Sequence, residues 1–254
     1  MHDPIYLENT AKNSIFVFIH GFMGSPRQFD RLAHSVHAQG YSAASLLLPG
    51  HGSTVKEFSS ATMENWQDYI EAEVGRLPTD YDGIHLVGHS MGCLLAINEA
   101  AKNRRNIHSL FLIACPLKLK GFSVHSLKVR LKQVFYRKSH PVKAVYMASN
   151  SVPPTPSLIW RIAKPTAELK KLIQRTNNNL SSVHVPVTAV FSLDDELVSI
   201  ESLDMLKNGL AQASFNSIMI SDSLHAYYPE HEYSIIESSL FSSISIQEQV
   251  DEAL

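Results

Sequence analysis

The sequence predicts an α/β protein whose mostly parallel sheet is covered by helices on both faces. Six short runs rich in aliphatic, β-branched and aromatic residues predict buried strands at 14–19, 42–48, 84–87, 109–114, 185–191 and 215–220. Helical patterns lie between most of these runs. Strands that alternate with helices form βαβ units, in which the strands run parallel and the helices pack on the sheet.

Two helical patterns are defined by the spacing of apolar residues. One consists of Trp66, Tyr69, Ile70 and Val74, at i, i+3, i+4 and i+8. The other lies near the C-terminus, where Pro229-Glu230 predicts a helix start. Its apolar residues are Ile235, Ile236, Leu240 and Phe241.

The composition is that of a globular protein with an ample core. Of the 254 residues, 44% are hydrophobic and 18% charged, which predicts one α/β domain with an insertion. No run approaches the roughly 20 apolar residues of a membrane-spanning helix, and the N-terminus lacks the basic start and apolar run of a signal peptide. Cys93 and Cys115 are too few for a disulfide framework. We therefore expect a reducing, cytoplasmic location.

The alternation of strands and helices is interrupted once, between Pro116 and about Ser182. Helical patterns and a proline-rich stretch at 152–156 replace any strand there, and residues 116–175 hold 13 Lys and Arg but one acid, Glu168. Such a charge contrast suggests a separate unit. We predict a core of residues 1–115 and 183–254, with a basic helical cap of residues 116–182 over the carboxyl ends of the strands.

The motif with the clearest chemistry is Gly88-His89-Ser90-Met91-Gly92, which follows a predicted strand and opens a helix rich in small residues. A Gly-x-Ser-x-Gly sequence in this setting is typical of a nucleophile elbow. The turn is so sharp that side chains at Gly88 and Gly92 would collide with neighbouring backbone, and Ser90 is expected to adopt a strained conformation. Ser90 is the predicted nucleophile.

A serine hydroxyl needs a base to remove its proton, and in this fold an acid and then a histidine follow the serine along the chain. His225, just beyond the last predicted strand, is the expected base. Its rival His231 falls on the predicted final helix. Asp194 and Asp195 both follow the fifth strand, and spacing alone does not separate them as the acid that orients the imidazole.

The oxyanion of a tetrahedral intermediate needs two backbone N–H donors. One is expected from Met91, the residue after the nucleophile, and the other from the loop after the first strand, where His20-Gly21-Phe22 makes Phe22 the candidate. We expect Gly88, His89, Gly92, His20 and Gly21 to form the elbow and its support.

The combined motifs resemble those of the small bacterial carboxylesterases and monoacylglycerol lipases of the α/β-hydrolase superfamily. The resemblance runs from about Ser14 to the C-terminus. It implies Asp195 as the acid, because the family's acid stands three residues before a Val or Ile, here Val198. It also implies Phe22 and Met91 as oxyanion donors and a mechanism without metal or cofactor. The motifs that carry it are His20-Gly21-Phe22-Met23-Gly24-Ser25, Pro49-Gly50-His51-Gly52, Gly88-His89-Ser90-Met91-Gly92, Asp195-Glu196-Leu197-Val198 and His225.

The predicted cap has two features that bear on the substrate. Residues 125–138 place apolar side chains on one helical face, which is expected to line an acyl-binding cleft, and basic side chains around it. The charge is interpreted either as a solvated outer face or as a surface that attracts an anionic partner such as an acyl carrier protein. No nucleic-acid motif accompanies it. The candidate contacts for an anionic partner are Lys128, Arg130, Lys132, Arg137 and Lys138.

These observations leave three functions to distinguish. The first is hydrolysis of carboxylic esters, with short or medium acyl chains or monoacylglycerol-like, through an acyl-enzyme on Ser90. The second is a methyl ester esterase of the biotin-pathway type, acting on a substrate bound to an acyl carrier protein. The third is a binding protein without catalysis, which the presence of Ser90, an acid and His225 disfavours. Dehalogenase and epoxide hydrolase chemistry would need an aspartate in place of Ser90.

Overall fold

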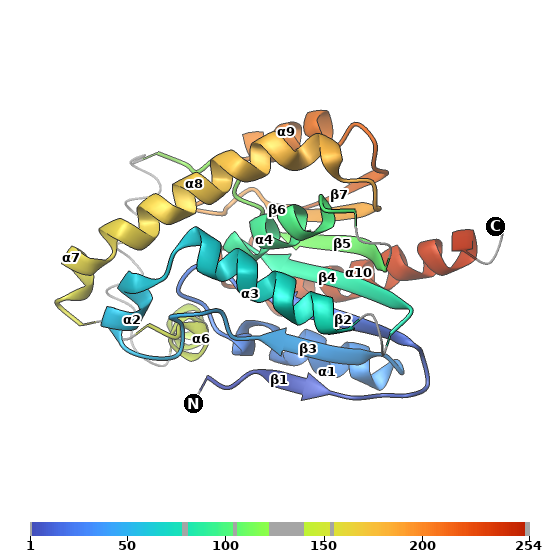
Figure 1. Cartoon of the computed structure of the whole chain (residues 1–254), viewed down its shortest axis with the longest axis horizontal. Helices are drawn as coiled ribbons and strands as arrows, with labels where there is room; N and C mark the ends of the chain where they lie inside the picture. The colour runs from blue at the N-terminus through green and yellow to red at the C-terminus, as the bar shows by residue number, and fades with distance from the viewer. Residues whose placement is uncertain (1, 78–80, 104–105, 122–139, 153–154, 252–254) are drawn as a thin grey trace.

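The computed structural model contains one seven-stranded sheet in the order β1-β3-β2-β4-β5-β6-β7 (Figure 1). The structure describes residues 2–77, 81–103, 106–121, 140–152 and 155–251. Six strands run parallel and match the six predicted ones, which confirms the α/β-hydrolase fold. They are β2 (Ser14–Ile19), β3 (Ser42–Leu46), β4 (Gly83–His89), β5 (Ile107–Ile113), β6 (Val187–Ser192) and β7 (Phe215–Ile220).

A seventh strand, β1 (Ile5–Leu7), was not predicted. It pairs antiparallel with β3 at the edge of the sheet. Its three residues, with Tyr6 exposed and Ile5 and Leu7 half-buried, are too few to show a strand pattern in sequence. An edge strand pairs on one side only, so it needs no continuous apolar run.

Helices cover both faces of the sheet, as predicted. The described helices are η1 (Pro26–Phe29), α1 (Asp30–Ala38), α2 (Val55–Ser60), α3 (Met63–Arg76), α4 (Met91–Ala100), α6 (Pro141–Ser149), α7 (Leu158–Arg161), α8 (Ala163–Asn179), η3 (Leu180–Ser182), α9 (Glu201–Gly209) and α10 (Glu230–Asp251). In the parts of the chain that the structure describes, no helix combines the length and apolar character that crossing a bilayer requires.

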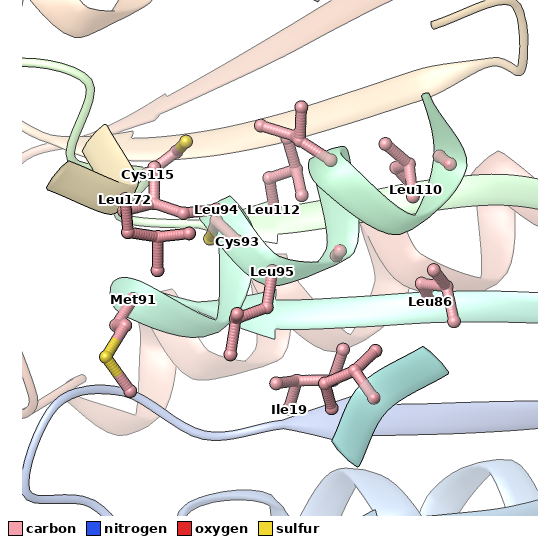
Figure 2. Close-up of a cluster of buried hydrophobic side chains, with 14 of the residues drawn as sticks. Ile19, Leu86, Met91, Cys93, Leu94, Leu95, Leu110, Leu112, Cys115 and Leu172 are labelled. Carbon is pink, nitrogen blue, oxygen red and sulfur yellow. The ribbon is translucent and has the colours of Figure 1, made fainter. Parts of the chain in front are cut away.

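The core on one side of the sheet includes residues of α3, α4, α8 and α9. Trp66 and Val74 on α3 are fully buried there, as their spacing predicted. Helix α4 is buried along its whole length, because it lies between the strands and α8, which contributes Leu172 (Figure 2). A helix that is covered on all sides is apolar all round, which explains the Cys-Leu-Leu-Ala-Ile sequence of α4.

The opposite face packs against α1 and α10. Phe16, Phe18 and Phe111 project from the strands into this second core. Helix α1 supplies Leu32 and Val36, and α10 supplies apolar residues of the predicted C-terminal pattern, among them Ile236 and Leu240. Ile235 of the same pattern is 42% exposed and lies off this stripe.

The order of the strands determines where the functional site lies. From β2 the chain moves to β3 on one side, and from β3 it crosses back to β4 on the other side of β2. Ligands of open parallel sheets bind where the order reverses, outside the carboxyl ends of the strands. Here those ends carry His20 and Gly21 after β2 and Ser90 after β4.

Candidate active site

Ser90 occupies the sharp turn between β4 and α4. Its backbone has φ 52° and ψ −120°, in the left-handed region that a non-glycine residue rarely adopts. A Cβ at Gly92 would lie 1.9 Å from the carbonyl oxygen of Ile19, and one at Gly88 would lie 2.5 Å from the backbone nitrogen of Cys93. The two glycines thus allow the close approach that the sequence predicted.

His225 lies between Ser90 and Asp195, and its two ring nitrogens contact one of these residues each. Its Nε2 is 2.9 Å from the Oγ of Ser90, and its Nδ1 is 2.8 Å from the Oδ2 of Asp195. A carboxylate only accepts hydrogen bonds, so Nδ1 carries the proton and Nε2 is free to accept the hydroxyl proton of Ser90. The fold therefore brings Ser90 to His225, 135 positions further along the chain, and His225 to Asp195, which precedes it by 30 positions.

The two rival residues lie elsewhere. Asp194 is exposed, whereas Asp195 is 2% exposed and faces the imidazole. His231 lies on α10, as predicted, and its Nε2 is 3.2 Å from a carboxylate oxygen of Asp222, where both side chains are exposed. The geometry thus selects between alternatives that spacing left open.

Asp195 is held as a carboxylate by its surroundings. Burial by itself raises the pKa of Asp195, but the charge of His225 and hydrogen bonds from His225 and two backbone N–H groups outweigh burial and lower the pKa. Those N–H groups belong to Val198 and Leu197, at 2.8 Å and 2.7 Å from Oδ1. An ionised carboxylate in this position has the chemistry to orient an imidazole and to stabilise an imidazolium.

Two buried glutamates, to which the sequence motifs assigned no role, support the loop of His225. Glu196 accepts the backbone N–H of His225 at 2.9 Å. Glu232, on α10, accepts the backbone N–H groups of Ser221 and Asp222 at 2.6 Å and 2.9 Å and also binds the hydroxyl of Ser223. Acidic residues are usually exposed, so no pattern in the sequence distinguishes these two from surface glutamates.

Hydrogen bonds orient the Gly21–Phe22 peptide in the loop after β2. The Gly21 carbonyl accepts the N–H of Gly24 at 2.9 Å and contacts the Nδ1 of His20 at 2.9 Å. His20 Nε2 accepts the N–H of Leu48, so Nδ1 is the protonated nitrogen and donates to that carbonyl. In a trans peptide the N–H points opposite to the carbonyl. The Phe22 N–H is therefore directed away from His20, on a loop that lines the cavity at Ser90.

A cavity of about 470 Å³ opens at Ser90 and His225. Gly21 and Phe22 form one part of its wall, and Tyr146 and Ser149 of α6 and Thr166 and Leu169 of α8 form another. Segments between β5 and β6 thus form part of the lining of this cavity. Its remaining lining is mainly apolar and includes Pro116, Leu119, Ile162 and Leu197.

The predicted contacts for an anionic partner lie outside the described residues, as does the whole of the predicted apolar face of 125–138. These contacts are Lys128, Arg130, Lys132, Arg137 and Lys138. The basic residues of α8 are described. Lys171 pairs with Glu168 at 2.8 Å, and Arg175 donates to Gln67 at 2.7 Å. Lys171 and Arg175 thus each bind a side chain of the same protein.

Within the described ranges, Asp222, His231 and Glu232 form a group whose ligand atoms lie within 4.8 Å of one another. Both oxygens of Glu232 already accept hydrogen bonds from the loop 221–223, as given above. Asp222 and His231 are exposed. In this group, Glu232 therefore binds the loop 221–223 to α10.

Comparison with known proteins identifies the family. Residues 16–210 match the family described as "Alpha/beta hydrolase family". This chain belongs to the alpha/beta hydrolase family. The predicted family is thereby confirmed, and so is the predicted class of enzyme, a carboxylic ester hydrolase.

Two curated relatives illustrate the range of similarity. The thermostable monoacylglycerol lipase of Bacillus sp. (strain H-257) is 24% identical over 245 residues, covering 94% of this alpha/beta hydrolase and 92% of that protein. "Probable lysophospholipase BODYGUARD 4" of Arabidopsis thaliana is 36% identical over 102 residues, 39% of this chain. The latter match spans only 24% of the plant protein.

Solved structures share the fold over nearly the whole hydrolase chain. One, from work on the metagenome-derived lipolytic enzymes LipS and LipT, has a TM-score of 0.75 at 21% identity and covers 96% of this chain and 98% of that chain. The monoacylglycerol lipase of Paleococcus ferrophilus has a TM-score of 0.69 at 17% identity, with the same coverage of 96% and 98%.

Proposed function

We propose that this alpha/beta hydrolase cleaves carboxylic esters of short or medium acyl chains, or monoacylglycerol-like esters, through an acyl-enzyme on Ser90. The observation that carries the proposal is the continuous contact from Asp195 through His225 to Ser90, at 2.8 Å and 2.9 Å. Contact of a nucleophile with a base, and of the base with an orienting acid, is the arrangement that activates a serine.

In the proposed reaction, the Oγ of Ser90 attacks the ester carbonyl while Nε2 of His225 takes the hydroxyl proton. The negative charge that develops on the carbonyl oxygen is stabilised by the N–H groups of Phe22 and Met91, the latter at the N-terminus of α4. The ester C–O bond then breaks, and His225 returns the proton to the leaving alcohol. Water, deprotonated by His225, attacks the acyl-enzyme, releases the carboxylic acid and restores Ser90.

The wall of the cavity supports an uncharged, apolar acyl group as the substrate. Leu119, Ile162, Leu169 and Leu197 offer apolar contact area. Lys120, the one cation on this wall among the described residues, donates its ammonium to the backbone carbonyl of Asp195. A cation already engaged in this way adds little attraction for an anionic acyl group. The monoacylglycerol lipases among the relatives agree with this substrate class.

Turnover of p-nitrophenyl esters from acetate to dodecanoate tests the proposal. The wild type should show a maximum at short or medium chains, and Ser90→Ala should lose at least about a thousand-fold in kcat. Ser60→Ala, the same change on an exposed serine, is the matched control and should keep full activity. A fluorophosphonate probe should label the wild type and not Ser90→Ala. Turnover that survives Ser90→Ala would overturn the proposal.

A second candidate is a methyl ester esterase that acts on a substrate bound to an acyl carrier protein. The 13 basic residues against one acid in residues 116–175 favour it, because such a surface steers an acidic partner toward the site. Charge reversal at Arg130, Lys132 and Arg137 should slow hydrolysis of a carrier-bound methyl ester and hardly change that of the free ester. Equal effects on both esters would argue against it.

The cysteines support a reducing compartment as part of this proposal. Cys93 and Cys115 are both buried and carry free thiols. Burial raises the pKa of the Cys93 thiol, which keeps it protonated and unreactive. We therefore retain the cytoplasm as the expected location.

A further inference from the structure

His89, the second residue of the elbow, takes no part in the proposed reaction, yet it is buried beside His225. Their ring centroids are 5.1 Å apart, and the Nε2 of His89 is 2.8 Å from the backbone carbonyl of His225. Its Nδ1 is 3.3 Å from the side-chain nitrogen of Gln28. A buried imidazole with two partners is constrained in both orientation and tautomer.

Gln28, on η1, connects His89 to the loop after β2. Its Oε1 accepts the backbone N–H of Gly21 at 2.9 Å. The space around it is tight, since a Cβ at Gly24 would lie 2.5 Å from that same oxygen and one at Gly21 would lie 2.9 Å from the Nδ1 of His89. The Gln28 amide thus fits between two glycines that leave room for it.

The donor and the acceptor of each hydrogen bond between Gly21 and His225 follow from the groups at the two ends, an N–H of Gly21 and a carbonyl of His225. Gly21 N–H can only donate, so the amide oxygen of Gln28 faces it and the amide NH₂ faces His89. The Nδ1 of His89 must then accept, which places its proton on Nε2. That N–H donates to the carbonyl of His225, which can only accept. Burial lowers the pKa of His89 to about 3, so the ring is neutral and keeps one tautomer at neutral pH.

We propose that Gln28 and His89 are positioning residues that couple the loop carrying the Phe22 donor to the backbone of His225. This inference rests on the proposed function. In the wild type, Gly21 precedes the proposed oxyanion donor, and His225 is the proposed base. The relay Gly21–Gln28–His89–His225 connects the loop of the proposed oxyanion donor to the backbone of the proposed base in one hydrogen-bond network. Displacement of a catalytic group by about 1 Å can lower the rate of an enzyme up to a hundred-fold.

Replacement of Gln28 distinguishes a relay from a simple loop anchor. Gln28→Met keeps the length of the side chain and removes both hydrogen bonds, so kcat should fall by about ten-fold with little change in KM. Gln28→Glu keeps an acceptor for Gly21 N–H but presents a second acceptor to the Nδ1 of His89. If Gln28 only anchored Gly21, Gln28→Glu would be as active as the wild type. The relay predicts a loss comparable to that of Gln28→Met.

The tautomer of His89 gives a readout that does not depend on turnover. Long-range ¹H–¹⁵N spectra of the whole protein, with the His89 signals assigned by their loss in His89→Phe, should show a protonated Nε2 and an unprotonated Nδ1. In Gln28→Glu, Nδ1 should become protonated. Gln39→Met, the same change on an exposed glutamine, should leave both the kinetics and the spectrum unaltered.

Two outcomes would overturn the relay. One is a protonated Nδ1 on His89 in the wild type, and the other is wild-type kinetics in both Gln28 variants. Failure of the proposed function has a different signature, which is hydrolysis that does not depend on Ser90. The spectrum of His89 tests the relay in that case as well.

Discussion

The hydroxyl of Tyr146 donates a 2.8 Å hydrogen bond to Glu196, whose other carboxylate oxygen accepts the backbone N–H of His225 at 2.9 Å. Tyr146 lies on α6, between β5 and β6, and lines the cavity. Burial, and next the neighbouring charge of Glu196, raise the pKa of Tyr146 and keep its hydroxyl protonated as a donor. The segment predicted as a cap is thus linked to the proposed catalytic base through one buried carboxylate.

This link predicts the effect of Tyr146→Phe. The variant removes one donor to a buried carboxylate while keeping the ring that lines the cavity. The loss is on the order of one hydrogen bond, so kcat/KM should fall by about five-fold with p-nitrophenyl butyrate. Tyr6→Phe, at an exposed tyrosine of β1, is the control. Unchanged kcat/KM in Tyr146→Phe would show that Glu196 keeps its position without this contact.

Glu232→Ala should weaken both folding and turnover. The change leaves the backbone N–H groups of Ser221 and Asp222 without their carboxylate acceptor, at a cost of about 1–2 kcal/mol in the free energy of unfolding. His225 follows this loop directly, so kcat should fall as well. Urea titration and steady-state kinetics measure the two effects, and Glu8→Ala, at an exposed glutamate, is the control. A stability loss with unaltered kcat would mean that the loop keeps its shape without Glu232.

Gly92→Ala should destabilise the fold strongly. The added methyl would lie 1.9 Å from the carbonyl oxygen of Ile19, and backbone of β2 has no room to move away. We expect a loss of about 3 kcal/mol or more in the free energy of unfolding. Gly121→Ala has no heavy atom within 4 Å of the new Cβ and should unfold like the wild type. Equal stability of the two variants would contradict the close approach at the elbow.

Buried neutral histidines predict that stability falls in mild acid. Burial lowers the pKa of His85 to about 3, from an ordinary value of 6.5. In the unfolded chain His85 therefore becomes protonated below about pH 6.5, whereas in the folded chain it becomes protonated only near pH 3. The contribution of neutral His85 to the free energy of unfolding is complete above pH 6.5 and is lost as the pH falls toward 3.

At pH 5 this difference amounts to about 2 kcal/mol for one such histidine. Urea unfolding between pH 7 and pH 5 measures it. In His85→Asn the dependence of the free energy of unfolding on pH should be shallower than in the wild type by about one proton. An identical slope in His85→Asn would mean that His85 becomes protonated without unfolding.

Features that depend on residues close together in the chain could be predicted from the sequence. Six strands are visible because each is a short run rich in aliphatic, β-branched and aromatic residues. The elbow is visible because glycine, serine and glycine must occur at fixed spacing between a strand and a helix. The order of serine, acid and histidine follows from the elbow through the fold that it implies. The three-residue β1 escaped prediction because so short a segment carries no periodicity.

Contacts between polar residues of different elements could not be predicted and became visible in the folded chain. Adjacent aspartates are equivalent in sequence, but the turn after β6 buries Asp195 against His225 and leaves Asp194 exposed. Gln28, Glu196 and Glu232 belong to residue types that normally face solvent. Their roles arise from hydrogen bonds to residues of other elements, 61 positions apart for Gln28 and His89, 29 for Glu196 and His225, and 11 for Glu232 and Ser221. The spacing of residues along the chain indicates which face of a helix or strand is apolar. Hydrogen bonds between polar groups of different elements form only when those elements pack together.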